Sequence, residues 1–467
     1  MSIKLQRIEV KHIGVRMEWK SLPTLFGILA VILFSVGTAG PCLSFFLVDF
    51  TIALENSSAT VGMTQSLYFG AVLLLGPLAV IMSKRYGDKE TIIVGCVMVS
   101  GGLMMTSQTT SVWQLFISHS LIAGTGTSLV VSSIVFIIGH HFSCSAVYLG
   151  FMYSGSASGM LLTPICCAQL KRFLGFRGTI LVLGALSMNS IPVSLFVFKR
   201  YSKKHGQSKR TESPAIAMTD ECVGSVVDQK IIRNESDDDT NRRTLSSEMC
   251  RCVHGISTLS LFLENKNLIL LTIVRALTEY AYIGFFIHFT ASLIYKGVPE
   301  QEAAFALGSF GLGSLCGRLT AFLPEYIHLW NKNSTFIMAM LIVGTLMIVF
   351  DYIRTVYVTI MSAALIGYFI GWYLILFPAL VRGSVCKERF KDAYGAINIP
   401  AGIICTFAGY TVGLVYDISE SYRLSFFIVG GIFVLSCVLM TIANIVPKLQ
   451  KQRLLTNEKT IRLRSAI

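Results

Sequence analysis

Charged residues are scarce in this sequence. Only 14% of its 467 residues are Asp, Glu, Lys or Arg, whereas a soluble domain carries about 25%. The stretch from Thr91 to Leu170 contains none of them. A helix needs about 20 apolar residues to cross ~30 Å of hydrocarbon, so this stretch is long enough for three crossings with tight turns. The shortage excludes an ordinary soluble fold and indicates a membrane-embedded chain.

Two further absences narrow the class of membrane protein. The apolar runs lack the period-two alternation of a membrane β-barrel, so we interpret them as helices that satisfy their own backbone groups. No small-residue cleavage site follows the first apolar run, which extends from Leu22 to Val48. That run is also too long for a signal-peptide core, and we expect it to be a retained first helix.

Disulfides are not expected, although the chain has twelve cysteines. None of them falls in a predicted external loop, which is the usage of reduced thiols that serve as small apolar residues. Seven lie in predicted helices and five in predicted cytosolic segments: Cys42, Cys96, Cys166, Cys167, Cys316, Cys405 and Cys437, then Cys144, Cys222, Cys250, Cys252 and Cys386. The spacing Cys250-x-Cys252-x-His254 lacks a fourth ligand, and we expect neither a metal nor a cofactor.

The apolar runs predict an all-α membrane protein with twelve transmembrane helices in two six-helix bundles. The predicted helices span 23–48, 62–83, 91–107, 113–138, 145–169, 178–198, 267–293, 303–322, 334–350, 356–380, 393–416 and 424–446. The domains are an N-tail (1–22), a first bundle (23–198), a linker (199–266), a second bundle (267–446) and a C-tail (447–467). The linker mixes basic patches with an acidic run and is predicted to be disordered.

The placement of Lys and Arg predicts that both termini lie in the cytosol. Apart from the long linker, the segments predicted to be internal carry 19 basic residues and the external loops carry six. This asymmetry accounts for the net charge of +13 without a nucleic-acid partner. The sequon at Asn56 is predicted to be external, whereas the sequons at Asn234 and Asn333 are predicted to be internal.

Short motifs rich in glycine recur at intervals along the predicted helices. They are Gly76-Pro77-Leu78, Lys84-Arg85-Tyr86-Gly87, Val94-Gly95, Gly124-Thr125-Gly126, Gly150, Gly155 and Gly159, Gly175-Phe176-Arg177-Gly178, Gly371-Trp372, and Gly413 to Asp417 with Tyr422 and Phe426. This set resembles the motifs of the monocarboxylate transporter family of the major facilitator superfamily. The matches are spread over nearly all of the membrane part. The resemblance implies a secondary transporter that alternates access to a substrate site between its two bundles near the midplane.

The chain also departs from the family pattern, which indicates a divergent member. The usual opening Asp-Gly-Gly-Trp of helix one is replaced by Met17-Glu18-Trp19-Lys20. Proton-coupled lactate carriers have a lysine in helix one and an aspartate one turn before the arginine of helix eight. Here the corresponding positions read Gly40-Pro41-Cys42 and Ser314, while Arg318 is retained. Ser143-Cys144-Ser145 replaces a basic pair. The resemblance therefore supports the fold of the family, whereas these differences argue against proton–lactate symport.

Arg318 is the first candidate for substrate binding, because ionisable groups inside a bilayer are costly and are functional candidates by default. A guanidinium offers a planar fork of donors that matches a carboxylate and stays charged at any cellular pH. The alternative is that Arg318 extends to the cytosolic surface, since it lies about 6 Å from the predicted end of its helix.

Helix seven supplies the other predicted substrate residues. Arg275 and Glu279 are four residues apart, hence on one face, and Tyr282 extends that face. They form either a self-neutralised pair that holds the helix against a neighbour, or a site in which Glu279 accepts the coupled proton. His288 could contact substrate or titrate, but a hydrogen-bonded structural histidine is the favoured interpretation.

Glycines and prolines are predicted to shape the transport path. Gly155 and Gly159 let helix five approach a neighbour closely, and Gly76 and Gly87 belong to the family-like motif between helices two and three. Pro41 and Pro400 weaken helical hydrogen bonds, and such breaks border cavities where the freed carbonyls find partners.

The leading prediction is a secondary transporter of small monocarboxylate-like anions in the plasma membrane. A proton is the candidate co-transported ion. We do not expect the protein to be an enzyme. The runner-up is a facilitator, without proton coupling, of neutral or zwitterionic solutes such as aromatic amino acids or creatine-like compounds. A membrane receptor or a membrane enzyme is the rival from a different class. The resemblance also implies a single-pass immunoglobulin-type chaperone as a partner of some members. The lipid bilayer is the other expected partner.

Overall fold

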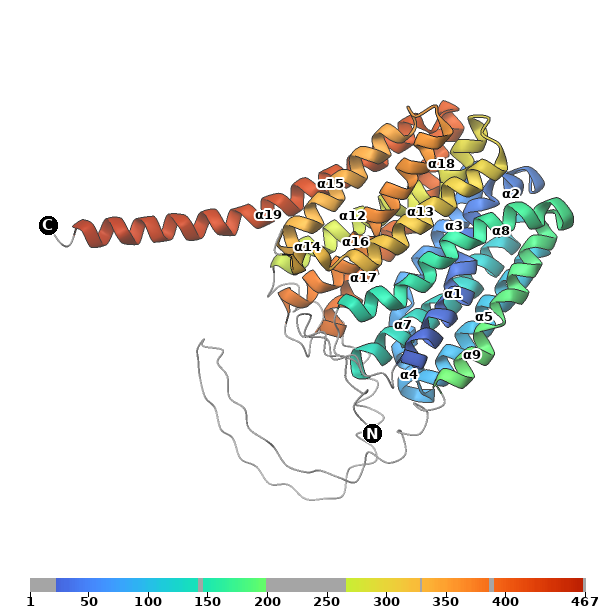
Figure 1. Cartoon of the computed structure of the whole chain (residues 1–467), viewed down its shortest axis with the longest axis horizontal. Helices are drawn as coiled ribbons and strands as arrows, with labels where there is room; N and C mark the ends of the chain where they lie inside the picture. The colour runs from blue at the N-terminus through green and yellow to red at the C-terminus, as the bar shows by residue number, and fades with distance from the viewer. Residues whose placement is uncertain (1–21, 142–145, 199–265, 328–329, 386–389, 465–467) are drawn as a thin grey trace, which may run out of the picture.

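The fold is described here from a computed structural model that covers residues 22–141, 146–198, 266–327, 330–385 and 390–464. Within these ranges the chain forms helices and no strand (Figure 1). The first half contains α1 (Leu22–Phe45), α2 (Leu47–Ala53), α3 (Ser58–Leu74), α4 (Gly76–Tyr86), α5 (Asp88–Ser107), α6 (Val112–Leu115), the π-helix η2 (Phe116–Ala123), α7 (Gly124–His141), α8 (Ala146–Ser187) and α9 (Ser190–Val197). The second half contains α12 (Lys266–Tyr295), α13 (Glu300–Thr320), α14 (Leu323–Tyr326), α15 (Lys332–Phe350), α16 (Val356–Ser384), α17 (Phe390–Cys405), α18 (Ala408–Ser419) and α19 (Tyr422–Arg464).

The twelve predicted crossings are confirmed once bent and folded-back helices are counted. Nine helical stretches of the described chain are apolar and long enough to cross a membrane, or ten with the pair α3 and α4, which is bent by 49°. One of these stretches, Gly150–Val197, has 48 residues and turns back at Gly175 (φ 68°). Val197 consequently packs against Gly27, near the start of α1. The eleventh and twelfth crossings are the second limb of this stretch and α13, whose 21 residues include Glu300, Glu302 and Arg318.

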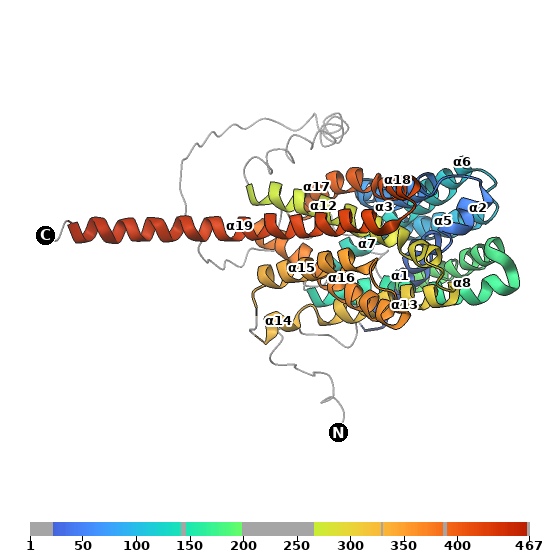
Figure 2. The same ribbon diagram turned by 90° about the horizontal axis from the view of Figure 1, so that it is seen from above.

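The outer surface of the described bundle is rich in exposed apolar side chains, as expected of helices that face lipid. Examples from both halves are Phe26, Trp113, Phe173, Phe196, Met361 and Ile442. Helix α19 continues beyond the predicted end of the last crossing and leaves the bundle (Figures 1 and 2). Helix α1 begins on this side. We call the opposite side, where α1 ends and Lys171 pairs with Asp49 of α2, the Lys171 end.

Several of the glycines and prolines named above lie at or near irregular points of the helices. Gly87 separates α4 from α5 with φ 105°, a left-handed value at which any residue with a Cβ would be strained. Pro41 has no N–H group, so the carbonyl of Gly37 lacks its helical donor. Thr163 donates to that carbonyl at 3.0 Å, and Gln65 donates to the carbonyl of Gly40 at 2.7 Å. On the C-terminal side of Pro400, the helix is interrupted between Cys405 and Ala408.

Backbones approach closely where glycines face each other. Gly159 of α8 lies against the backbone of Gly37 of α1, and Gly155 lies against the carbonyl of Leu29. A Cβ at position 159 would collide with the Gly37 backbone, which cannot rotate away as a side chain could. These two glycines therefore set the spacing of α1 and α8 inside the first bundle.

Gly159→Ala should destabilise the protein by about 1–3 kcal/mol, the usual cost of overpacking a filled interior. Melting of the detergent-solubilised protein, followed by intrinsic fluorescence or size-exclusion chromatography, measures the loss. Gly101→Ala is the matched control, because a Cβ at Gly101 meets nothing within 4 Å. Equal melting temperatures for the two variants would contradict the proposed role of the close approach.

Candidate substrate site between the two bundles

The two halves of the described chain meet along two seams. Helix α8 of the first half packs along α13 of the second, and α3 packs along α17 and α18. The second seam is lined by glycines, where Gly62 faces Gly409 and Gly70 faces Gly402. A solute that passes between the halves has to lie between these seams, so polar groups there are the candidates for its binding site.

Arg318 of α13 reaches across the first seam and does not extend to the surface. Its side chain is about 5% exposed, and its Nη1 donates to the Tyr153 carbonyl and, at 2.6 Å, to Ser156 Oγ of α8. Its Nε is buried and makes no hydrogen bond. The Oγ of Ser314, one turn earlier on α13, is also buried without a partner.

These two unpaired groups offer binding capacity for a ligand. Residues i and i+4 of a helix share a face, so Ser314 and Arg318 lie on the same side of α13. Leaving a buried donor unpaired costs about 1–3 kcal/mol, and more when the group is charged. A carboxylate can accept from a guanidinium Nε and from a hydroxyl together, and this arrangement fits the end of a small organic anion.

Arg275 and Glu279 form an ion pair inside the second bundle. Their side chains are nearly buried, and Arg275 Nη1 lies 2.6 Å from Glu279 Oε1. Tyr373 of α16 joins the pair, since its hydroxyl accepts from Arg275 at 3.0 Å and donates to Glu279 at 3.3 Å. Arg275 also stacks over the ring of Phe377, 4.8 Å from its centroid. The pair is thus neutral as a unit and holds α12 against α16.

Tyr282 connects this pair with Arg318. It follows Glu279 by three residues, on the same face of α12, and its ring stacks on Phe310 of α13 at 6.4 Å. Tyr153 of α8 reaches the same region, because its carbonyl accepts from Arg318 Nη1. Four of the five predicted substrate residues therefore gather around one region formed by α8, α12 and α13.

His288 lies apart from this region. It is nine residues beyond Glu279 on α12, about 13 Å along the helix axis. Its Nε2 is 2.9 Å from the Gly409 carbonyl and its Nδ1 is 3.2 Å from the Tyr422 hydroxyl. Both ring nitrogens thus have partners on α18 and α19, which is the arrangement of a structural histidine.

A second buried histidine, His119 of the π-helix η2, is not among the residues predicted from the sequence. Its Nε2 lies 2.7 Å from Gln65 Oε1 of α3, its ring stacks on Tyr68 at 4.9 Å, and its Nδ1 has no partner. The only sequence signal is a lone histidine in an uncharged run. A π-helical turn, which is frequent at functional sites, is not readable from that run.

Three charged residues at the Lys171 end tie the two bundles together, and we call them the Lys171 latch. Lys171 of α8 lies 2.7 Å from Asp49 of α2 and 2.6 Å from Glu300 of α13, which belongs to the second bundle. Burial raises the pKa of Asp49 even though Lys171 acts in the opposite direction. Next to the latch, Arg172 donates to Gln301 at 2.6 Å. Residue 171 falls between the predicted helices 145–169 and 178–198, and its spacing in the sequence gives no sign of these partners.

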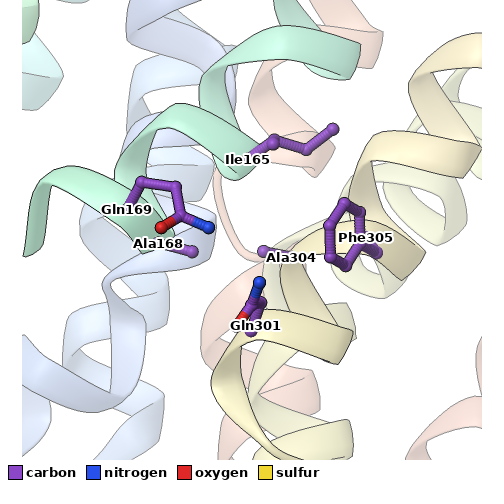
Figure 3. Close-up of a pocket in the computed structure, with 6 residues that line it drawn as sticks. All are labelled: Ile165, Ala168, Gln169, Gln301, Ala304 and Phe305. Atoms are coloured by element: carbon purple, nitrogen blue, oxygen red, sulfur yellow. The ribbon is translucent and has the colours of Figure 1, made fainter. Parts of the chain in front are cut away.

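A pocket at the same end is not the substrate site. It lies between α8 and α13 and is lined by Ile165, Ala168, Gln169, Gln301, Ala304 and Phe305 (Figure 3). The pocket has no room for a water-sized molecule, whereas typical ligand sites enclose roughly 300–1,000 Å³. Ala304 precedes Arg318 by fourteen residues, or about 21 Å along α13.

Lys171→Gln is expected to loosen the contact at the Lys171 end by up to about 1 kcal/mol, or roughly fivefold, because its ion pairs are partly exposed. An Ala304→Cys reporter in the buried wall should then react faster with a membrane-impermeant maleimide. Lys296→Gln is the matched control, since Lys296 pairs with Asp351, which also belongs to the second bundle. Equal acceleration by both variants would contradict the latch.

Comparison with known families agrees with this architecture. The sequence model of the Major Facilitator Superfamily matches residues 25–350. The chain belongs to this superfamily of membrane transporters. A solved structure of a mutant of the nucleoside transporter NupG superposes with a TM-score of 0.63 and 12% identity, covering 90% of this chain and 99% of that one. At such low identity, this likeness shows the fold alone.

Within the superfamily, the resemblance predicted from the motifs is confirmed. The chain is 22% identical to monocarboxylate transporter 12 of Homo sapiens over 88% of its own length and 78% of the relative's. It is 24% identical to monocarboxylate transporter 14 of Mus musculus, covering 86% of each chain. The chain is thus a divergent relative of the monocarboxylate transporters, and a multi-pass membrane protein of a transporter superfamily.

Proposed function

We propose that this protein is a secondary transporter that moves a small monocarboxylate-like anion by alternating access, with Arg318 binding the carboxylate. The observation that carries the proposal is a buried guanidinium between the bundles that has a free donor and no carboxylate partner among the described residues. The partnered Arg275 cannot play this part as readily, because Glu279 already neutralises it. The monocarboxylate transporter relatives support the substrate class.

Ser314 favours a second candidate, a facilitator of neutral or zwitterionic solutes that needs no proton. A hydroxyl at this position cannot take up and release a proton in the physiological range, whereas a carboxylate near a cation could. A zwitterion such as an aromatic amino acid or a creatine-like compound still offers Arg318 a carboxylate. Its positive end would lie near Tyr282 and Tyr153, whose rings can bind a cation.

Purified protein in liposomes tests the function directly. We expect saturable uptake of at least one of lactate, pyruvate, a ketone body, an aromatic amino acid or creatine, with mutual competition between solutes that share the site. Protein-free liposomes and heat-inactivated protein give the background. Linear, non-saturable uptake of every solute would refute the proposal, and preference for creatine or amino acids over pyruvate would favour the second candidate.

The proposed membrane is the plasma membrane, with both termini in the cytosol. Glycosylation distinguishes this orientation from its inverse. With both termini in the cytosol, Asn56 is the one sequon of the three that would face the exterior. Asn56 is exposed between α2 and α3, at the Lys171 end. An Asn56→Gln variant that loses a glycan supports the orientation, and glycosylation at Asn333 would reverse it. An immunoglobulin-type chaperone remains a prediction from the family.

A further inference from the structure

The region around Arg318 carries an unbalanced positive charge. Arg275 and Glu279 cancel each other, whereas Arg318 takes part in none of the ion pairs formed by the described residues. The titratable groups that act on Arg318 are the phenols of Tyr282 and Tyr153, which are neutral at physiological pH. The side chains described in this region therefore sum to one positive charge.

That charge changes the energy of closing the site. Withdrawing an unpaired ion from water costs several kcal/mol, and an arginine cannot escape the cost by losing its proton. A bound monoanion cancels the charge and fills the free hydrogen-bonding positions of Arg318 and Ser314. Enclosing the site between the bundles is therefore easier with a carboxylate bound than with no ligand.

We propose that the protein is an anion exchanger, which returns across the membrane with a second carboxylate in place of the first and returns slowly when empty. The inference rests on the proposed function, because it assumes that Arg318 binds the transported anion. It adds the mode of transport: one monoanion enters for each monoanion that leaves, with no net movement of charge and no need for a coupled proton.

Ser314 is the position that sets this property. An aspartate there would lie one turn from Arg318 on the same face of α13, at the spacing of a helical ion pair. The side chains of the empty site would then sum to zero and the penalty for empty return would fall. The bound monoanion would meanwhile face a second negative charge, so substrate affinity should fall as well.

The test compares uptake of radiolabelled pyruvate into proteoliposomes that contain unlabelled pyruvate with uptake into otherwise identical vesicles that contain chloride and no carboxylate. Valinomycin with equal potassium on both sides holds the membrane potential at zero. We expect preloading to raise the initial rate at least about tenfold, the ratio that corresponds to ~1.4 kcal/mol between empty and loaded return. If pyruvate is not a substrate, the best carboxylate from the uptake panel replaces it on both sides.

The outcomes separate the inference from the function on which it rests. Equal saturable uptake into both kinds of vesicle overturns exchange and leaves the transporter assignment intact. Absence of uptake of every carboxylate, with or without preloading, overturns the proposed function and exchange together. Net uptake that is driven by an inward proton gradient into vesicles without carboxylate also overturns exchange.

Two variants at one position test the physical cause. Ser314→Asp should bring the ratio of preloaded to empty uptake close to one, whereas Ser314→Asn, of similar size but uncharged, should keep the wild-type ratio. If asparagine lowers the ratio as much as aspartate does, charge is not the cause and the inference fails. Melting temperatures show whether each variant is folded, and the wild-type comparison stands even if Ser314→Asp is not.

Discussion

Arg318→Gln is expected to abolish saturable uptake, with a loss of at least about a hundredfold in Vmax/KM. Glutamine keeps a donor near Tyr153 and Ser156 but removes the charge. A hydrogen bond to a charged group contributes about 1.5–3 kcal/mol, so losing the bond from Nε together with the attraction of the positive charge accounts for a factor of this size. Initial uptake rates in proteoliposomes over a range of substrate concentrations give the number.

Arg318→Lys and Arg354→Gln sharpen this test. Lysine keeps the charge but not the planar fork, so we expect an intermediate loss of about tenfold. Arg354 is exposed in the segment before α16, and its replacement should leave uptake unchanged. If Arg318 only latched α13 to α8, its replacement would change Vmax and leave KM constant. A rise in KM is the result that assigns it to the substrate.

Glu279→Gln should lower the stability of the protein by about 3–5 kcal/mol, the usual cost of removing one partner of a buried ion pair. Arg275 would keep its charge while Tyr373 and Phe377 offer only a hydroxyl and a ring face. The reciprocal Arg275→Met change should be as damaging. The double variant Arg275→Met with Glu279→Leu should recover most of the loss, because a well-packed apolar pair can replace a buried ion pair. Thermal melting of the wild-type protein and the three variants measures the loss and its recovery.

The same variants decide whether Glu279 also handles a proton. If uptake by the wild-type protein depends on pH through this carboxylate, the dependence should vanish in the double variant while transport itself persists. An unchanged pH profile would leave Glu279 as a purely structural partner of Arg275. Exchange without a coupled proton, as inferred above from Arg318, requires the second result.

The sequence predicts the helices well, because their signal is local. Each crossing can be recognised from its own run of about 20 residues with few charges. These runs locate all twelve crossings within a few residues. The hairpins α5–α7 and α15–α16 are neighbours, as their short connections require. The long linker at 199–266 lies outside the described residues apart from Lys266, so its disorder remains a prediction.

The site is less predictable, because its partners are distant in sequence. Helical spacing predicts the Arg275–Glu279 pair, which is four residues apart, but not Tyr373, which completes it from α16. Arg318 is recognisable as a costly buried charge, whereas its contacts with Tyr153 and Ser156 depend on how the bundles dock. No periodicity in a single sequence encodes that docking, and the roles of the candidate residues in transport remain predictions.

Lys171 has one carboxylate partner, Asp49, in its own bundle and another, Glu300, in the second bundle. When the halves part, the ammonium group keeps Asp49 as a neighbour, and only Glu300 has to exchange its partner for water. No bare ion is left behind, so the step costs little more than a weak surface pair, about 1 kcal/mol or less. Thermal motion can therefore break the Lys171–Glu300 ion pair many times a second. The pair re-forms readily because Asp49 keeps Lys171 in place.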